Sequence, residues 1–151
     1  MISRNAHRLA ILGWIAFMAG CGVSRWPVNG PLAAPFGMRW DGALPDVHKG
    51  IDIVVVSGTP VAAMAPGRVR FSGTMEDYGL VVWLDHDDEV VTVYAHLSEL
   101  RVASGNELAK GAILGLSGST GNASGPHLHF EIWRRGIQID PVAMLGGPPG
   151  P

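Results

Sequence analysis

Short apolar runs broken by glycine make up most of the chain from Gly30 onward. No stretch keeps a convincing helical period for more than two turns, whereas runs of β-branched residues between turn signals are typical of strands. The pattern therefore predicts a mostly β fold. The predicted strands are residues 51–56, 67–72, 80–85, 90–96, 113–117 and 127–133, and residues 98–100 are predicted to form a single helical turn.

The first 20 residues differ in composition from the rest. Arg4 and Arg8 precede an apolar run at 9–19, which is typical of a secretory signal peptide. This run is too short to span a bilayer core, which takes about 20 residues; an uncleaved interfacial anchor is the alternative. The segment ends in Met-Ala-Gly before Cys21, which resembles the bacterial lipobox, in which the cysteine becomes the lipidated N-terminus.

We therefore expect a signal peptide at 1–20 and a short linker at 21–29 that starts from lipidated Cys21. A domain at 30–145 and a disordered tail at 146–151 follow. Gly22 rather than aspartate follows the cysteine, and by resemblance to sorting rules in diderm bacteria this favours a periplasm-facing lipoprotein of the outer membrane. The alternative is an incidental cysteine at an ordinary signal-peptidase site.

Charge and cysteine content narrow the classes of partner. Without the first 20 residues the chain has 9 basic and 13 acidic side chains, a formal charge of −4. No basic field would attract nucleic acid, so no nucleic-acid partner is expected. Cys21 is the only cysteine, so an internal disulfide is impossible. No prediction of oligomeric state follows from the sequence.

Candidate chemistry begins in the segment 117–133, where a glycine-rich loop runs into a predicted strand. Successive side chains of a strand point to opposite faces, so His127, His129 and Glu131 share one face. Imidazole is the commonest protein ligand for zinc. An isolated pair of this kind is more often an ordinary polar strand face, so the remaining segments must supply partners.

Two further segments supply them. His48 stands four residues before Asp52, and an acidic side chain within the apolar run 51–56 is costly unless it is paired or bound to a metal. His96 ends the predicted strand 90–96, where alternation places it on one face with Thr92 and Tyr94. His86 precedes an acidic turn and has no such companion, so we expect a structural or surface role for it.

The count of histidines is more informative than any single site. Four of the five histidines after Cys21 fall in three short motifs, and one aspartate accompanies them. Two histidines and one carboxylate form the three-ligand set of a catalytic zinc, which leaves the fourth position for water. Two histidines then remain for acid–base work, but the residues alone do not say which two bind the metal.

The three motifs together resemble the lysostaphin-type, or LytM-like, zinc endopeptidases, which cleave peptide bonds in bacterial cell walls. The motifs are HxxxD at His48 and Asp52, YAHL at 94–97 and GPHLHFE at 125–131. The stretches PFGMR at 35–39, GTPVAAMAPGRV at 58–69 and IDPVAML at 139–145 extend the resemblance over residues 30–145. The resemblance implies an all-β, compact antiparallel fold of barrel or sandwich kind with a metal site in a groove on one sheet.

The resemblance also implies individual roles. His48, Asp52 and His129 correspond to the ligands of one zinc ion, and His96 and His127 to the catalytic pair. Glu131 shares the ligand face and either orients a ligand or is a solvent-facing carboxylate. Some family members use a tyrosine in the loop before the first motif, but residues 36–48 contain none.

The expected function is hydrolysis of peptides in peptidoglycan cross-links or stem peptides by a zinc metalloendopeptidase. The second hypothesis is a non-catalytic relative that binds the wall or activates amidases; such a protein should lack one of the five key residues. A structural zinc site is disfavoured, because closed sites use four protein ligands and commonly cysteine.

The glycine-rich loop 115–125 lacks the GK[ST] motif of phosphate-binding loops and leads into a strand rather than a helix. We therefore interpret it as a close backbone approach beside the substrate groove.

Overall fold

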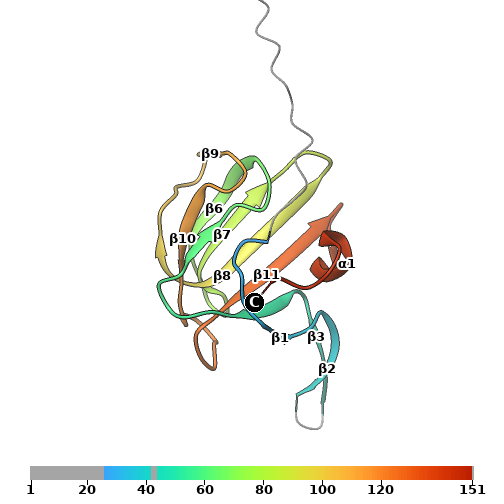
Figure 1. The fold of residues 1–151 in the computed structure, drawn as a ribbon. Coiled ribbons are helices and arrows are strands. Elements are labelled where there is room, and N and C mark those ends of the chain that lie inside the picture. Colours follow the sequence, from blue (N-terminus) through green and yellow to red (C-terminus); the bar gives the residue numbers. More distant parts are fainter. Residues whose placement is uncertain (1–25, 42–43, 151) are drawn as a thin grey trace, which may run out of the picture.

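In the described residues, 26–41 and 44–150, ten strands form one antiparallel sheet and two more form a separate hairpin (Figure 1). The predicted signal peptide and Cys21 lie outside the described residues. The strands are β1 (Leu32–Ala34), β2 (Gly37–Asp41), β3 (Leu44–His48), β4 (Ile51–Val54), β5 (Pro60–Ala62), β6 (Gly67–Met75), β7 (Gly79–Asp85), β8 (Val90–Leu100), β9 (Glu107–Leu108), β10 (Ile113–Ser117), β11 (His127–Arg134) and β12 (Ile137–Ile139). A short helix, α1 (Pro141–Leu145), follows β12.

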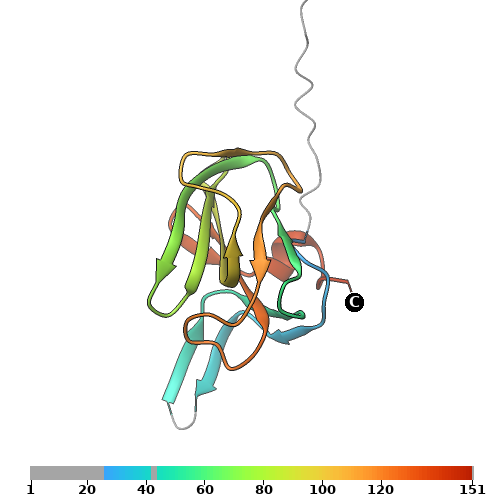
Figure 2. The ribbon, with the colours of Figure 1, turned by 90° about the vertical axis from the view of Figure 1, so that its left-hand side faces the viewer.

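The order of strands places the chemically interesting segments next to one another. The main path of the sheet is β1-β4-β11-β8-β7-β6-β9, while β10 pairs with β5 and β8, and β12 pairs with β11. Figure 2 shows that the sheet curls around on itself. Because β4 and β8 flank β11, three segments that are far apart in sequence come together on one face.

The predicted all-β, antiparallel fold is confirmed, and each of the six predicted strands is present. The strand predicted at 113–117 has the observed bounds, and the others differ by up to four residues at an end. The helical turn predicted at 98–100 is wrong: these residues continue β8, because Glu99 and Leu100 pair with β10.

Alternation along β11 divides the two faces of the sheet as expected. Leu128, Phe130 and Ile132 are fully buried and belong to the main hydrophobic core. The rings of Tyr94 and Phe130 are in contact there, with centroids 5.3 Å apart. Burial of these large apolar side chains provides the main driving force for folding, and it fixes which face of β11 is left for chemistry.

The hairpin of β2 and β3 projects from one end of the sheet (Figures 1 and 2). Its cross-strand pairs include Met38 with Val47 and Arg39 with Asp46. The apolar side chains Met38, Trp40 and Val47 are all exposed. The pattern of buried apolar residues therefore does not identify this hairpin, and the sequence analysis predicts no strand there.

Both ends of the described chain pack against the domain. Trp26 contacts Phe130 edge-on, and Val28 belongs to the core. At the other end, the carbonyl of Gly150 accepts a hydrogen bond of 2.8 Å from the backbone N–H of Gly30. Residues on both sides of the predicted domain, 30–145, therefore contact it. Among the described residues, no helix is long and apolar enough to cross a membrane.

Candidate metal centre

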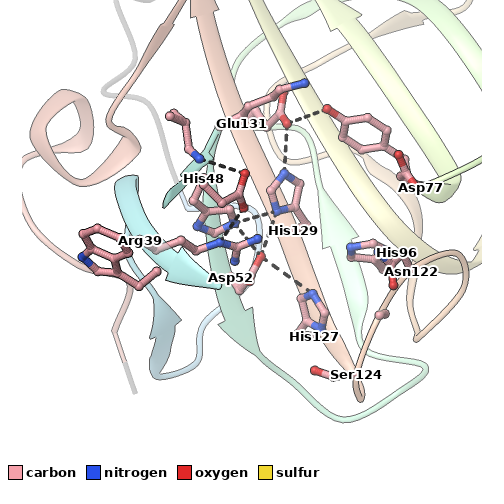
Figure 3. A pocket seen from close by; sticks show the side chains of 16 residues that line it. Arg39, His48, Asp52, Asp77, His96, Asn122, Ser124, His127, His129 and Glu131 are labelled. Atoms are coloured by element: carbon pink, nitrogen blue, oxygen red, sulfur yellow. Dashed lines mark hydrogen bonds and ion pairs between the residues drawn. The ribbon is translucent and has the colours of Figure 1, made fainter. Parts of the chain in front are cut away.

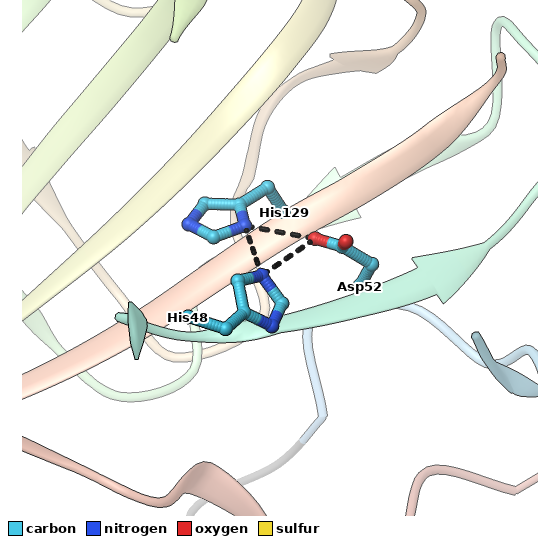
Figure 4. A group of neighbouring side chains, drawn as sticks. All are labelled: His48, Asp52 and His129. Carbon is cyan, nitrogen blue, oxygen red and sulfur yellow. Dashed lines mark hydrogen bonds and ion pairs between the residues drawn. The ribbon is translucent and has the colours of Figure 1, made fainter. Parts of the chain in front are cut away.

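Three side chains from separate segments converge on one point (Figure 4). His48 ends β3, Asp52 lies in β4 and His129 lies in β11, where the strand register places it directly opposite Asp52. His129 Nδ1 is 2.8 Å from Asp52 Oδ1. His48 Nε2 is 3.2 Å from the same oxygen and 3.2 Å from His129 Nδ1. The predicted ligand set is therefore together.

The outward-facing nitrogens of the two histidines define their tautomers. His48 Nδ1 lies 2.8 Å from the carbonyl oxygen of Pro35, and because that oxygen can only accept, Nδ1 carries the proton. His129 Nε2 likewise donates to Glu131 Oε1 at 3.0 Å. In the neutral rings the inward nitrogens then present lone pairs to each other beside the Asp52 carboxylate, whereas a protonated ring donates a hydrogen bond to that carboxylate. This arrangement fits a divalent cation, which is the partner that two lone pairs and a carboxylate share most favourably.

The electrostatics of the centre favour positive charge. Burial alone would raise the pKa of Asp52, but the hydrogen bonds from His129 and His48 outweigh it and hold that pKa well below its usual range. Burial would lower the pKa of His129, yet Asp52 and Glu131 raise it to about 9. Either a proton or a metal ion supplies the positive charge that the centre favours, and a metal ion would displace the proton when it binds.

Glu131 is fully buried, so the interpretation of it as a solvent-facing carboxylate is wrong. It accepts hydrogen bonds from His129 Nε2, from the Tyr78 hydroxyl at 2.8 Å and from the Trp133 indole N–H. Burial would raise the pKa of Glu131, but these bonds, chiefly that from His129, lower it. Glu131 is therefore a carboxylate that fixes the ring of His129.

His96 and His127 lie beside the metal ligands (Figure 3). Their ring centroids are 4.7 Å apart. His96 Nδ1 donates to the carbonyl of Thr120 and His127 Nδ1 to that of Gly125, each at 2.8 Å, so Nε2 of each ring carries the lone pair. Burial lowers the pKa of His96, which favours the neutral form that accepts a proton.

His96 reaches this face through a break in the alternation of β8. Simple alternation grouped it with Tyr94, but Tyr94 points into the core and is fully buried. The register with β7 shifts between the pairs Val82–Tyr94 and Leu80–Leu97, and His96 has a φ of 59°. A β-bulge with a residue in the left-handed region therefore turns His96 toward the metal ligands. The predicted residue is at the site, but the predicted face of the strand was wrong.

Thr120 holds this bulge. Its hydroxyl donates to the carbonyl of Leu97 at 2.6 Å and accepts from the N–H of Leu80 at 2.9 Å. These backbone groups belong to the pair Leu80–Leu97, which adjoins the shift in register between β7 and β8. The same residue's carbonyl accepts the Nδ1–H of His96, so one residue stabilises the bulge and orients the ring.

Two glycines allow Thr120 to lie so close. A Cβ on Gly79 would be 2.4 Å from Thr120 Oγ1, and a Cβ on Gly121 would be 2.3 Å from the backbone nitrogen of Gly79. Both glycines have positive φ, 63° and 73°. The close backbone approach expected for the loop 115–125 is therefore present, and it brings the turn after β6 against that loop.

The two histidine pairs lie in a groove of about 760 Å³. Its walls come from the β2–β3 hairpin, the turn at 76–78 and the loop at 122–124. Arg39 and Tyr78 line it as well, although no role for them was predicted. Arg39 lies in the quoted PFGMR stretch, which was a usable signal, whereas Tyr78 stands in a turn whose sequence gives none. The Tyr78 hydroxyl is engaged with Glu131.

His86 has the structural role that was expected. It is not among the metal-centre residues of the described chain; instead its Nδ1 donates to the carbonyl of Pro66 and its Nε2 bonds Thr92 Oγ1, both at 2.7 Å. Thr92 Oγ1 in turn lies 2.9 Å from the hydroxyl of the buried Tyr94. This chain of hydrogen bonds satisfies polar groups beneath the sheet.

Comparison with known proteins gives consistent findings. The model of Peptidase family M23 matches residues 46–141. Over 115 residues the chain is 41% identical to the "DD-carboxypeptidase/endopeptidase Mpg" of Neisseria meningitidis, and the alignment covers 75% of this chain and 26% of that protein. Over 125 residues it is 35% identical to the "Murein hydrolase activator EnvC" of Escherichia coli, and that alignment covers 83% of this chain and 29% of the relative. The chain thus spans little more than a quarter of either relative.

Solved structures show the same similarity. The catalytic domain of lysostaphin from Staphylococcus simulans matches with a TM-score of 0.72 and 30% identity, covering 78% of this chain and 93% of that one. A zinc-containing peptidase from Vibrio cholerae matches with a TM-score of 0.75 and 27% identity, covering 85% and 40%.

Proposed function

Because the chain belongs to peptidase family M23, we propose that it is a zinc-dependent endopeptidase that hydrolyses peptide bonds in peptidoglycan cross-links or stem peptides. The observation that carries the proposal is the convergence of His48, Asp52 and His129 beside a second pair of histidines. Ligand atoms of the three residues lie within 4.8 Å of one another. Three protein ligands are the number used by catalytic rather than structural zinc sites.

In this proposal His48 Nε2, Asp52 Oδ1 and His129 Nδ1 hold one zinc ion. When bound, zinc supplies Lewis-acid polarisation of the scissile carbonyl and acidifies water. Imidazole and carboxylate ligands suit zinc better than magnesium or calcium. The hydrogen bond from His129 to Glu131 keeps the ligating nitrogen aimed at the centre.

His96 and His127 provide the proton transfers. With Nδ1 of each ring fixed on a backbone carbonyl, the Nε2 of one accepts a proton from the attacking water. That proton then passes to the leaving amine nitrogen, either from this ring or by way of the other. The protonated ring can also stabilise the tetrahedral oxyanion. The geometry supports both histidines in this work without dividing the two roles between them.

Support for peptidoglycan as the substrate comes from the relatives. The Neisseria relative is named a DD-carboxypeptidase/endopeptidase, and the Escherichia coli relative is named a murein hydrolase activator. The second of these names refers to murein, and we propose a location in the cell envelope for this chain. An anchor at Cys21 facing the periplasm, at the outer membrane, is part of this proposal, and intact-mass analysis of the membrane form tests it.

The second candidate is a non-catalytic activator of wall amidases, which the similarity to EnvC favours. The five residues of the metal centre and catalytic pair weigh against it, because an activator has no use for a complete hydrolytic set. All five are present in this chain.

Digestion of purified sacculi separates the two candidates. The zinc-loaded protein should release soluble muropeptides, a chelator should stop the release and added zinc should restore it. Asp52→Ala removes a ligand and should be inactive, whereas Arg101→Gln, which breaks an exposed pair with Glu99, serves as the surface control. A metal-loaded protein that releases nothing, but stimulates an added amidase, would refute the hydrolase and support the activator.

A further inference from the structure

A second hollow of about 420 Å³ lies on the same face of the sheet as the metal groove. Trp83 of β7 and Trp133 of β11 line it, together with Val91 of β8 between them. Both tryptophans are partly buried. Arg70 and Arg135 stand at its margins. Apart from the indole N–H of Trp133, which donates to Glu131, the proposed chemistry uses none of these side chains.

The two indoles form one aromatic surface. Their ring centroids are 6.4 Å apart and the planes are inclined by 29°, so the rings are stacked with an offset. Together they pack over the buried Val93. The Trp83 indole N–H is buried and has no hydrogen-bond partner among the described residues.

The charges around the hollow cancel. Arg70 pairs with Asp85 at 2.7 Å, and Arg135 pairs with Glu89 at 2.9 Å. Burial lowers the pKa of His86, the remaining titratable group that lines the hollow, and so favours its neutral form. A charged ligand therefore gains no net attraction here, whereas a neutral ligand meets many donors and acceptors beside a flat apolar surface.

The hollow is joined to the metal centre through Glu131. Trp133 donates its indole N–H to this carboxylate, which also accepts from His129. Trp133 is four residues beyond His129 on the same strand, a distance of about 13 Å at 3.3 Å per residue. An extended peptide of roughly four residues spans the same distance.

We propose that Trp83 and Trp133 form a subsite for a neutral pyranose ring, such as an N-acetylated hexosamine of the glycan strand to which the stem peptide is attached. A pyranose has an apolar face that packs flat on an indole, and its hydroxyl and amide groups match the surrounding arginines and carboxylates. The inference rests on the proposed function, because a peptidoglycan substrate carries sugar and peptide in one molecule. It adds a contact with the sugar to a site that cuts the peptide.

Calorimetric titration of the zinc-loaded full chain with the tetramer of N-acetylglucosamine tests the subsite without requiring hydrolysis. We expect saturable binding that Trp83→Ala and Trp133→Ala each weaken about tenfold or more. Arg135→Gln removes a donor from an exposed position and should weaken binding severalfold, while the matched variant Arg101→Gln, in another exposed arginine–glutamate pair, should bind as the unmodified chain does. Zinc stoichiometry near one verifies that each variant is folded. If a tryptophan variant does not bind zinc, the difference in saccharide binding between Arg135→Gln and Arg101→Gln decides whether the subsite exists.

Kinetics give an independent readout. Trp83→Ala, which removes an indole with no hydrogen bond to the metal centre among the described residues, should raise KM for a sugar-bearing muropeptide several-fold and leave KM for the bare peptide unchanged. The inference is overturned if the saccharide does not bind saturably, if all variants bind it equally, or if a bare stem peptide is what the tryptophan variants fail to bind. Saccharide binding in a chain that hydrolyses nothing would refute the proposed function and leave the subsite intact.

Discussion

Replacing Thr120 by valine should slow catalysis while leaving the metal centre intact. Valine has the shape of threonine but lacks the hydroxyl that bridges Leu80 N–H and Leu97 C=O. Each lost hydrogen bond is worth about 0.5–1.5 kcal/mol, or about 1–3 kcal/mol together. The left-handed backbone of His96 costs a similar free energy. Without the hydroxyl, the bulge therefore loses most of the hydrogen-bond energy that offsets its backbone strain.

If that whole loss falls on the orientation of His96, the rate should drop roughly 5-fold to 150-fold. Steady-state kinetics on a defined cross-linked muropeptide should show the loss in kcat with KM nearly unchanged, because the residue acts through His96 and not on the substrate. Zinc stoichiometry should stay near one.

Two control variants sharpen the test. Thr120→Ser retains the hydroxyl and should keep kcat close to that of the unmodified protein. Thr59→Val removes a hydroxyl that donates to the carbonyl of Val56 at a similar distance of 2.6 Å, and it should leave kcat unchanged. An unaltered kcat in Thr120→Val would refute the role of the bulge, as would an equal loss in Thr120→Ser.

Three further predictions follow from the site and its surroundings. His96→Ala and His127→Ala should each abolish hydrolysis but still bind about one zinc per chain by elemental analysis; loss of metal from both variants would contradict the division into ligands and catalytic pair. Glu131→Gln should weaken zinc binding about 10-fold to 100-fold in a chelator competition, because a neutral amide orients His129 less firmly; equal affinity would contradict this. Since burial lowers the pKa of His86 from 6.5, the unfolded chain binds that proton first, and stability should fall as the pH drops below about 6.5. The free energy of unfolding, measured with urea between about pH 7.5 and about pH 5.5, should fall less steeply for His86→Gln than for the unmodified protein. The same dependence on pH in both proteins would refute the lowered pKa of His86.

The sequence predicted the strands whose apolar residues are buried, and it did so because burial imposes the alternation that the pattern reveals. β11 is the clearest case, with Phe130 in the core and Glu131 on the opposite face. The β2–β3 hairpin escaped prediction for the converse reason: Met38 and Val47 face each other across it but are both exposed. No burial pattern distinguishes such a hairpin from a loop.

The choice of ligands shows a second limit. His127 and His129 share one face of β11, so alternation cannot separate them. The separation comes from strand register, which places Asp52 opposite His129 and Val54 opposite His127. Register depends on contacts between distant segments, which is why the residue pattern left the choice open and only the family resemblance assigned it. The bulge at His96 likewise depends on Thr120, which lies 24 residues away.

The convergence of His48 and His129 has a consequence for folding that is separate from chemistry. These residues are 81 positions apart, and the chain's only cysteine excludes an internal disulfide. An ion bound by both would act as a removable cross-link that closes a long loop and restricts the denatured ensemble, as disulfides do. Resistance to heat and to proteases would then depend on metal supply.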